Sequence, residues 1–219
     1  MAERRERIYG RRPVAEAERG RREVHRIWRA PETPAEELTR LAGSSDHQGV
    51  VAEVDPYPYL DPAGLLGQRG ALLLALDQVQ DPHNLGAVCR SAEVAGAAGV
   101  VIPERRAAAV TAAVCKASAG AVEHLAVARV RNLADWLGEA RAADFWVWGA
   151  DAGAPSAYTK ADLSGATILV LGGEGKGLRP RVAAGCDGLL SIPQHGRIAS
   201  LNVSAAAAVL LFEALRQRA

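Results

Sequence analysis

From residue 71 onward, short apolar runs alternate with segments that have the apolar spacing of helices. The run ALLLALDQV at 71–79 is apolar almost throughout, whereas HNLGAVCRSAEVAGA at 83–97 has helical spacing. Strands without a polar face, alternating with helices, are typical of a parallel sheet covered on both faces. We therefore predict an α/β fold with a mostly parallel sheet and helices on both faces. The predicted strands cover 71–79, 99–103, 125–130, 145–151, 166–174 and 188–193, and the predicted helices cover 83–97, 111–125, 133–143, 179–186 and about 200–218.

The first 70 residues do not follow this pattern. Residues 1–54 are rich in Arg and Glu, with only short apolar stretches, and the segment DPYPYLDPAGLLGQRG at 55–70 is dense in Pro and Gly. A chain of 219 residues can hold one large and one small domain. We predict a small N-terminal domain over 1–54, a linker over 55–70 and a larger domain over 71–219.

Positive charge is concentrated near the N-terminus. The whole chain has a net charge of +1, but residues 4–29 contain ten Arg and four Glu, a local excess of +6. Such a segment can contact the phosphates of a nucleic acid, or it can be the solvated face of a helix. The residues alone leave both interpretations open.

The cysteines and the start of the chain indicate a compartment. Cys89, Cys115 and Cys186 are far apart and form no CxxC pair, which suits free thiols in a reducing environment. No apolar run reaches the roughly 18 residues of a membrane span, and MAERRERIYGRR lacks the apolar core of a signal peptide. We expect a cytoplasmic protein.

Three polar loops follow predicted strands at the edge where parallel α/β sheets bind ligands. These loops cover 77–84, 172–180 and 193–202. They and the helix after the first loop offer side chains that can bind an anion and orient a hydroxyl group, without a metal cluster or an activated nucleophile. Such a set suits a reaction whose reactive group arrives on a cofactor. The side chains are Asn84, Arg90, Glu174, Arg197, Ser200 and Asn202.

The loop GGEGKG at 172–177 does not match the known phosphate-binding fingerprints. It lacks the Ser or Thr and the glycine spacing of a P-loop, and Pro180 follows too soon for a dinucleotide fold. Glycines let a backbone approach a ligand closely, so four of them around Glu174 favour a ligand over an ordinary tight turn. The five histidines show no metal-binding spacing, and we predict no metal site.

Three segments in this order resemble the motifs of the SpoU/TrmH family of RNA ribose 2′-O-methyltransferases, which belong to the SPOUT class. They are DPHNLGAVCRSAEVAG at 81–96, ILVLGGEGKGL at 168–178 and LSIPQHGRIASLNVSAAAAVLLFEALRQR at 190–218. The resemblance implies S-adenosylmethionine as cofactor, RNA as substrate, a homodimer, and a trefoil knot in the C-terminal region that forms the cofactor pocket.

The resemblance also implies roles for individual residues. Catalytic roles fall to Asn84 and Arg90 in the first motif, to Glu174 in the second, and to Ser200 and Asn202 in the third. Cofactor binding, largely through the backbone, falls to Gly172, Ile192 and Leu201, with Leu171 and Gly173 beside them.

The N-terminal part narrows the expected substrate. The segments YGRRPVAEA, HQGVVAEV and YPYLD resemble the substrate-binding domain of the branch that methylates a guanosine in 23S ribosomal RNA. The strand–helix–strand material between these segments is mostly missing here, replaced by RAPETPAEELTRLAGSSD at 29–46. Two alternatives stay open: a transfer-RNA or antibiotic-resistance methyltransferase of the same family, and a non-catalytic RNA-binding ribosome-assembly factor.

Overall fold

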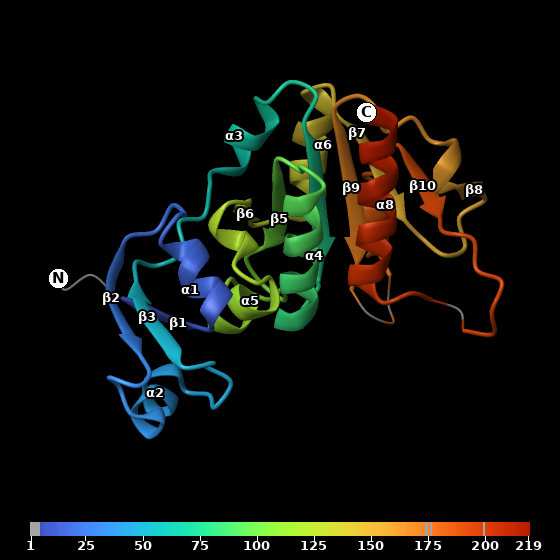
Figure 1. The fold of residues 1–219 in the computed structure, drawn as a ribbon. Coiled ribbons are helices and arrows are strands. Elements are labelled where there is room, and N and C mark those ends of the chain that lie inside the picture. The colour runs from blue at the N-terminus through green and yellow to red at the C-terminus, as the bar shows by residue number, and fades with distance from the viewer. Residues whose placement is uncertain (1–4, 174, 176, 199) are drawn as a thin grey trace.

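The computed structural model describes residues 5–173, 175, 177–198 and 200–219. Its larger part is a seven-stranded parallel sheet with the strand order β6-β5-β4-β9-β7-β10-β8 (Figure 1). The predicted α/β fold with a mostly parallel sheet is therefore confirmed. The strands are β4 (Leu72–Asp77), β5 (Gly99–Pro103), β6 (Ala126–Val130), β7 (Trp146–Ala150), β8 (Ser156–Ala157), β9 (Thr167–Gly172) and β10 (Gly188–Ser191).

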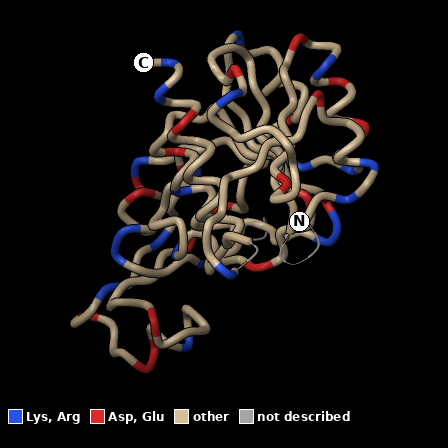
Figure 2. Tube along the Cα trace, turned by 90° about the vertical axis from the view of Figure 1, so that its right-hand side faces the viewer, with Lys and Arg blue, Asp and Glu red and all other residues tan. Residues whose placement is uncertain are grey.

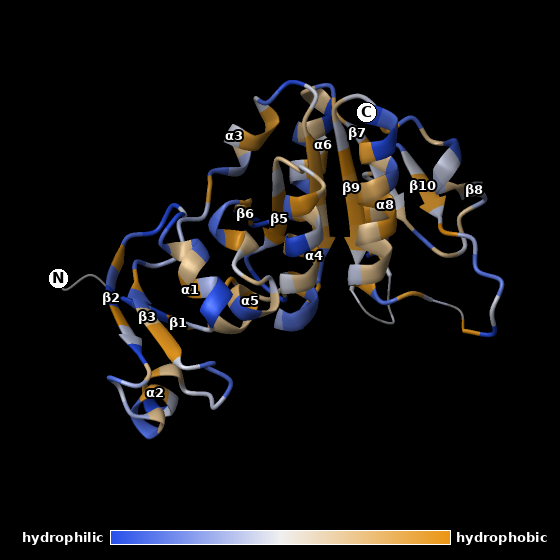
Figure 3. Cartoon of the chain, in the orientation of Figure 1, coloured by the Kyte–Doolittle hydropathy of each residue, from blue (hydrophilic) through white to orange (hydrophobic). Residues whose placement is uncertain are grey.

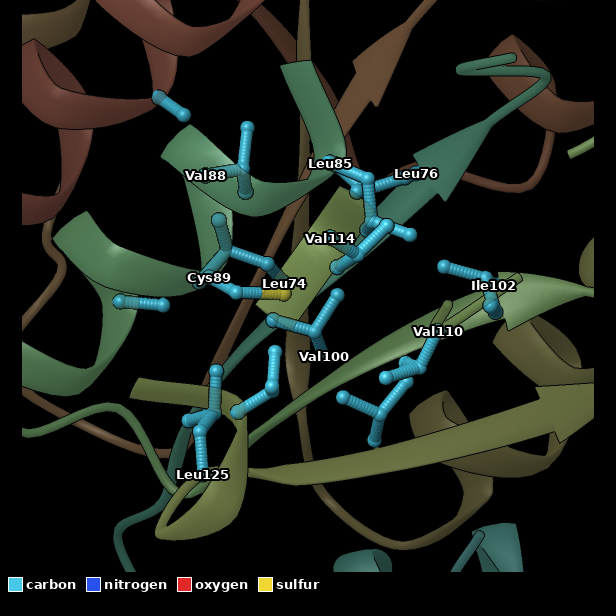
Figure 4. Close-up of a cluster of buried hydrophobic side chains, with 14 of the residues drawn as sticks. Leu74, Leu76, Leu85, Val88, Cys89, Val100, Ile102, Val110, Val114 and Leu125 are labelled. Atoms are coloured by element: carbon cyan, nitrogen blue, oxygen red, sulfur yellow. The ribbon is translucent and has the colours of Figure 1, made fainter. Parts of the chain in front are cut away.

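Helices cover both faces of this sheet because its strands have no polar side. On β4, Leu72, Leu74 and Leu76 pack toward α4 and α8, whereas Leu73 and Ala75 pack toward α3, α6 and α7. Figure 3 shows the resulting apolar strands between the helix layers, and Figure 4 shows part of the core under α4. The helices are α3 (Pro62–Leu66), α4 (Pro82–Val94), α6 (Leu133–Ala142), α7 (Pro180–Ala183) and α8 (Val203–Arg218).

Two helices differ from the prediction. The segment 111–125 is not one helix, because the chain turns at Ala119 (φ 54°) and Gly120 (φ 90°) between α5 (Ala112–Ala117) and the 3₁₀ turn η1 (Ala121–Glu123). The last helix begins at Val203 instead of about Ser200, because Asn202 is its N-cap and Ser200 and Leu201 are not helical. A second 3₁₀ turn, η2 (Tyr158–Lys160), follows β8.

The N-terminal module, defined here as residues 5–54, contains a three-stranded antiparallel sheet in the order β1-β3-β2. The strands are β1 (Glu6–Tyr9), β2 (Val24–Arg29) and β3 (Val50–Val54), and the helices are α1 (Arg11–Ala17) and α2 (Ala35–Ala42).

The segment that was expected to replace missing structure in this module contains a helix. Helix α2 starts after Pro34, carries Glu36 and Glu37 in its first turn, and buries Leu38 and Leu41. A strand, β2, and a helix, α2, therefore lie between the segments YGRRPVAEA and HQGVVAEV.

The segment 55–70, predicted to be a linker, packs against the large sheet. The Tyr57 hydroxyl donates to the carbonyl oxygens of Val122 and Leu125, both at 3.0 Å. Leu60 forms a bridge to Ala128 of β6, and α3 follows. The division into domains at 54 and 71 stays a prediction, as does the trefoil knot. No helix in the described part of the chain is long and apolar enough to cross a membrane.

Candidate active site

Two adjoining cavities lie at the carboxyl ends of β4, β9 and β10, the edge at which the three polar loops were expected to meet. The first cavity has a volume of about 530 Å³ and lies among the ends of β7, β9 and β10 and the start of α8. The second has a volume of about 290 Å³ and lies at the start of α4. Gly173 and Gly177 line both cavities. In Figure 1 this edge is at the bottom of the sheet.

The structure brings all five predicted cofactor-binding residues to the first cavity. Leu171, Gly172 and Gly173 reach it from the end of β9, Ile192 from the chain after β10, and Leu201 from the turn before α8. Most of its remaining wall is apolar or backbone. Their role as cofactor ligands stays a prediction.

Asn202 links the two cavities. Its Oδ1 accepts from the backbone N–H of Ser204 at 2.8 Å and from the Ser204 hydroxyl at 2.6 Å, which caps α8. Its Nδ2 donates to Oδ1 of Asn84 at 3.0 Å. Asn84 is 7 % exposed on α4 and lines the second cavity, while Asn202 lines the first. Two residues that lie 118 positions apart thus meet at the junction.

The other three predicted catalytic residues have different positions. Ser200 lines the first cavity. Glu174 lies outside the described residues. Arg90 lies on the exposed side of α4 and lines neither of the two cavities formed by the described residues. Arg197, which belonged to the same polar set, is exposed on the chain between β10 and α8.

Glycines are required where the loop after β9 folds back on its own strand. A Cβ atom on Gly172 would lie 2.1 Å from the carbonyl carbon of Gly177, and one on Gly173 would lie 2.5 Å from the carbonyl oxygen of Gln78. Gly175 and Gly177 have positive φ angles of 75° and 61°. The Gly-rich composition therefore follows first from close backbone packing, which in turn shapes the wall shared by both cavities.

An ion pair between the buried Asp77 and the partly exposed Arg179 fixes the end of this loop, and the sequence did not point to it. Asp77 is completely buried at the end of β4. Its Oδ2 accepts from the backbone N–H of Arg179 at 2.8 Å, and its Oδ1 lies 2.7 Å from both Nε and Nη2 of Arg179. The Asp77 carbonyl oxygen also accepts from the N–H of Gly173 at 2.8 Å. One residue therefore holds both ends of the segment 173–179.

The sequence analysis also missed the loop after β7. Asp151, Ala152 and Ala150 line the first cavity from the end of that strand. The rule that ligands bind at strand carboxyl ends applies to β7 as well. This loop contains one glycine and few polar side chains, so the only sequence signal for Asp151 is its position directly after a predicted strand.

Many arginines of the basic N-terminal segment are occupied by structural contacts. Arg22 is buried and paired with the buried Glu123, with Arg22 Nε donating to Glu123 Oε2 at 2.9 Å. Arg5 pairs with Glu53 at 2.8 Å, and Arg29 pairs with Glu18 at 3.3 Å.

Two other arginines of this segment lie over an aromatic ring. Arg7 and Arg26 lie over the ring of Trp28, at 5.9 and 4.9 Å from its centroid. In Figure 2, basic and acidic residues are interspersed along the chain. The +6 charge excess is therefore not one uniform phosphate-binding surface.

The cysteines are buried to different degrees and carry free thiols. Burial raises the pKa of Cys89 to about 12, which is typical of an unreactive core thiol. Among the described residues, no group of three or more His, Cys, Asp or Glu side chains is placed to hold a metal ion.

Comparison with known proteins gives consistent matches. Residues 71–212 match the model of the SpoU rRNA Methylase family. A putative TrmH family tRNA/rRNA methyltransferase, YacO of Bacillus subtilis, is 36% identical over 100% of this chain and 98% of its own length. Not all relatives have this length: the chain spans 62% of an uncharacterized tRNA/rRNA methyltransferase of Synechocystis that is 38% identical.

Solved structures have the same fold. An AdoMet-bound rRNA methyltransferase from Sinorhizobium meliloti has a TM-score of 0.86 at 26% identity and covers 97% of this chain and 87% of its own. A structure described as an RNA 2′-O ribose methyltransferase has a TM-score of 0.83 at 27% identity. The match covers 99% of this chain and 90% of the chain in that structure.

Proposed function

This chain belongs to the SpoU rRNA methylase family, and we propose that it transfers the methyl group of S-adenosylmethionine to a ribose 2′-oxygen of RNA. The observation that carries the proposal is the pair of adjoining cavities, joined by the hydrogen bond between Asn202 and Asn84. Two reactants must meet in such a reaction, and two neighbouring cavities with a shared wall suit that requirement.

The first cavity fits the methyl donor. Its apolar wall suits the flat adenine ring, and the backbone groups of Gly172 and Gly173 can pair with polar edges of the nucleoside. The carboxylate of Asp151 can accept from ribose hydroxyls or face a positive charge. When bound, S-adenosylmethionine supplies an electrophilic methyl group, so the protein needs no metal to activate it. The apolar side chains in the wall are Leu171, Leu190, Ile192, Leu201 and Val203.

The second cavity suits the nucleotide that is methylated. Gln78, Gln80 and Asn84 bring side-chain amides to its wall, and Asp81 caps α4 there through a 2.9 Å hydrogen bond from the N–H of His83. Amides can pair with base edges or with a ribose hydroxyl, and the 2′-hydroxyl distinguishes RNA from DNA. We assign the orientation of the ribose to Asn84, which Asn202 holds in place.

Arg90 is assigned to the RNA phosphate next to the reacting ribose. A guanidinium group keeps its proton under ordinary conditions and is a poor general base. It can clamp a phosphate and polarise the 2′-oxygen, and Glu174 and Ser200 complete the set that the family resemblance implies.

In a homodimer, Arg90 of one chain can reach the two reaction cavities of the other chain. The helices α4 and α8 pack side by side, and Val94, one turn after Arg90 on α4, is exposed, as are Phe212 and Leu215 on α8. A homodimer formed through this face buries these apolar side chains and presents Arg90 to the partner's cavities. Mixing an Arg90→Ala chain with an Asn202→Ala chain tests this arrangement. We expect partial recovery of activity in the mixture, because one site of the mixed dimer then keeps both residues.

The proposed RNA is 23S ribosomal RNA, with a guanosine as the methylated nucleotide, in the reducing cytoplasm that free thiols suit. The support is the N-terminal resemblance and the naming of relatives as tRNA/rRNA methyltransferases. The test is a transfer assay with labelled S-adenosylmethionine and, separately, unmodified 23S ribosomal RNA and transfer RNA, with mass spectrometry of the product nucleoside. We expect 2′-O-methylguanosine in the ribosomal RNA.

Other outcomes of the same assay separate the alternatives. Label in transfer RNA alone retains the reaction and discards the ribosomal substrate. Bound cofactor without label in either RNA favours a non-catalytic assembly factor. An Arg90→Lys variant should bind the cofactor normally and lose most methyl transfer, and normal turnover in that variant contradicts the role assigned to Arg90.

A further inference from the structure

A third cavity lies between the N-terminal module and α5, and it carries no role in the reaction described above. Its volume is about 580 Å³. Three of the six residues in its wall are cationic, and none is acidic. The wall consists of Arg11, Arg12, Pro13, Gln48, Lys116 and Ala119.

Neighbouring groups hold two of the three cations in position. Lys116 Nζ donates to the carbonyl oxygen of Asp46 at 2.8 Å and lies 3.6 Å from the Asp46 carboxylate. The Arg11 side chain donates from Nε to the carbonyl oxygen of Gln48 at 3.3 Å, and the Gln48 side chain accepts from the Arg11 backbone N–H at 3.1 Å.

Arg12 is the cation of this cavity that is available to a ligand. Its side chain is exposed, and no described residue forms an ion pair or hydrogen bond with it. With three cations and no carboxylate among the described residues of its wall, the cavity attracts an anion.

The cavity lies close to the start of α4. Helix α5, which contributes Lys116, packs on α4 at Gly86, where a Cβ atom would lie 2.5 Å from the Cβ of Ala117 and 2.9 Å from the backbone nitrogen of Ser118. Gly86 is two residues from Asn84. In Figure 1, α1 and α5 lie on the same edge of the molecule as the N-terminal end of α4.

We propose that this cavity binds a backbone phosphate of the RNA substrate on the side of the target nucleotide that faces the N-terminal module. The proposal rests on the proposed function and extends it. RNA is favoured over other anions because the wall of the cavity joins α5, which packs on α4 near Asn84, to the module on which Arg7 and Arg26 add positive charge over Trp28.

The test compares Arg12→Gln and the double variant Arg11→Gln/Arg12→Gln with the wild-type chain. Arg69→Gln is the matched control, because Arg69 is exposed just before β4, at the opposite edge of the sheet. RNA affinity is measured over a series of salt concentrations, together with S-adenosylmethionine affinity, KM for RNA and kcat.

We expect Arg12→Gln to weaken RNA binding about tenfold, the effect of losing one charge-assisted hydrogen bond. The slope of log K against log salt should fall by about 0.7 to 0.9 for each lost phosphate contact. The KM for RNA should rise, while kcat at saturating RNA and S-adenosylmethionine affinity should stay close to wild type. Arg69→Gln should change none of these values.

Three results overturn the proposal. Wild-type RNA affinity and salt slope in both variants, with methyl transfer intact, contradict the phosphate site but leave the proposed function standing. A wild-type chain that neither binds nor methylates RNA refutes the proposed function and this inference together. Titration with a nucleoside monophosphate gives the third arm: binding that is lost in the variants, with RNA affinity unchanged, assigns the cavity to a small free phosphate ligand.

Discussion

Asn202 caps α8 with its side-chain oxygen and holds Asn84 on α4 with its side-chain nitrogen. The two contacts fix the orientation of the amide, because the oxygen that accepts from the Ser204 N–H cannot also donate to Asn84. A helix start and a side chain of the second cavity therefore depend on one residue.

The two contacts of Asn202 can be separated by substitution. Asp is also a good N-cap, so Asn202→Asp should preserve the free energy of unfolding within about 0.5 kcal/mol, whereas Asn202→Ala should lower it by about 1 kcal/mol. Asp has no N–H to donate to Asn84, so we expect methyl transfer to fall at least about tenfold because Asn84 is no longer held in position. Urea unfolding and the transfer assay measure the two effects. Full activity in Asn202→Asp contradicts the positioning role.

The ion pair between Asp77 and Arg179 should support the first cavity. We expect Asp77→Asn to lower the free energy of unfolding by roughly 1–3 kcal/mol, because hydrogen bonds of a buried charged group are lost. Affinity for S-adenosylmethionine should fall as well, measured by calorimetry, because the segment 173–179 is held less firmly.

The exposed pair of Asp135 and Arg181, with a 2.6 Å contact, is the matched control for the Asp77 substitution. Asp135→Asn should change stability by less than about 1 kcal/mol and leave cofactor affinity unchanged. If the two substitutions changed stability and cofactor affinity equally, the proposed support of the cavity by Asp77 would be contradicted.

Charged substitutions on the exposed face of α4 and α8 should separate the proposed homodimer. We expect Phe212→Glu and Val94→Glu to produce monomers in size-exclusion chromatography with light scattering, because each buries an unpaired charge in the interface. Leu60→Glu, at a similarly exposed apolar residue outside these helices, is the control. Dimers that persist in both variants place the interface on another face.

Tyr57 predicts a dependence of stability on alkaline pH. Burial raises the pKa of its hydroxyl above the ordinary value near 10. In the unfolded chain this group loses its proton near pH 10, while the folded protein retains it, so its stabilising contribution is complete below pH 10 and is lost as pH rises beyond that value.

We expect Tyr57→Phe to lower stability at neutral pH by roughly 1–2 kcal/mol, because two carbonyl oxygens lose their donor. The variant should also show a weaker fall in stability above pH 10, by up to about 1.4 kcal/mol per pH unit. Unfolding curves collected from pH 8 to 11.5 measure both effects. Identical slopes in the two proteins would contradict this reading of the buried hydroxyl.

The parallel sheet could be predicted because strands such as β4 are apolar on both faces, a pattern that leaves few other folds. The break between α5 and η1 could not, since Ala119 adopts a positive φ angle that Ala seldom shows and that local sequence does not mark.

The site was predictable to the extent that its residues lie on polar or Gly-rich loops or in recognisable motifs. Asn84, Ser200 and Asn202, which line the two cavities, were singled out in this way, and the resemblance supplied the predicted cofactor set. Asp77 and Arg179 were not recognised as a pair, because 102 residues separate them and their meeting depends on β4 and β9 lying side by side. Asp151 was missed because its loop, with one glycine at Gly153 and few polar side chains, does not stand out in the sequence.

The wall that the two reaction cavities share has a thermodynamic consequence. Gly173 and Gly177 face both spaces, so an adjustment of this loop when one ligand enters also alters the space available to the other. Linkage then works in both directions: the factor by which the methyl donor changes affinity for RNA must equal the factor by which RNA changes affinity for the donor. In the proposed arrangement, the donor loses both its methyl group and the positive charge of its sulfur on transfer, so this wall faces a different ligand before and after the reaction.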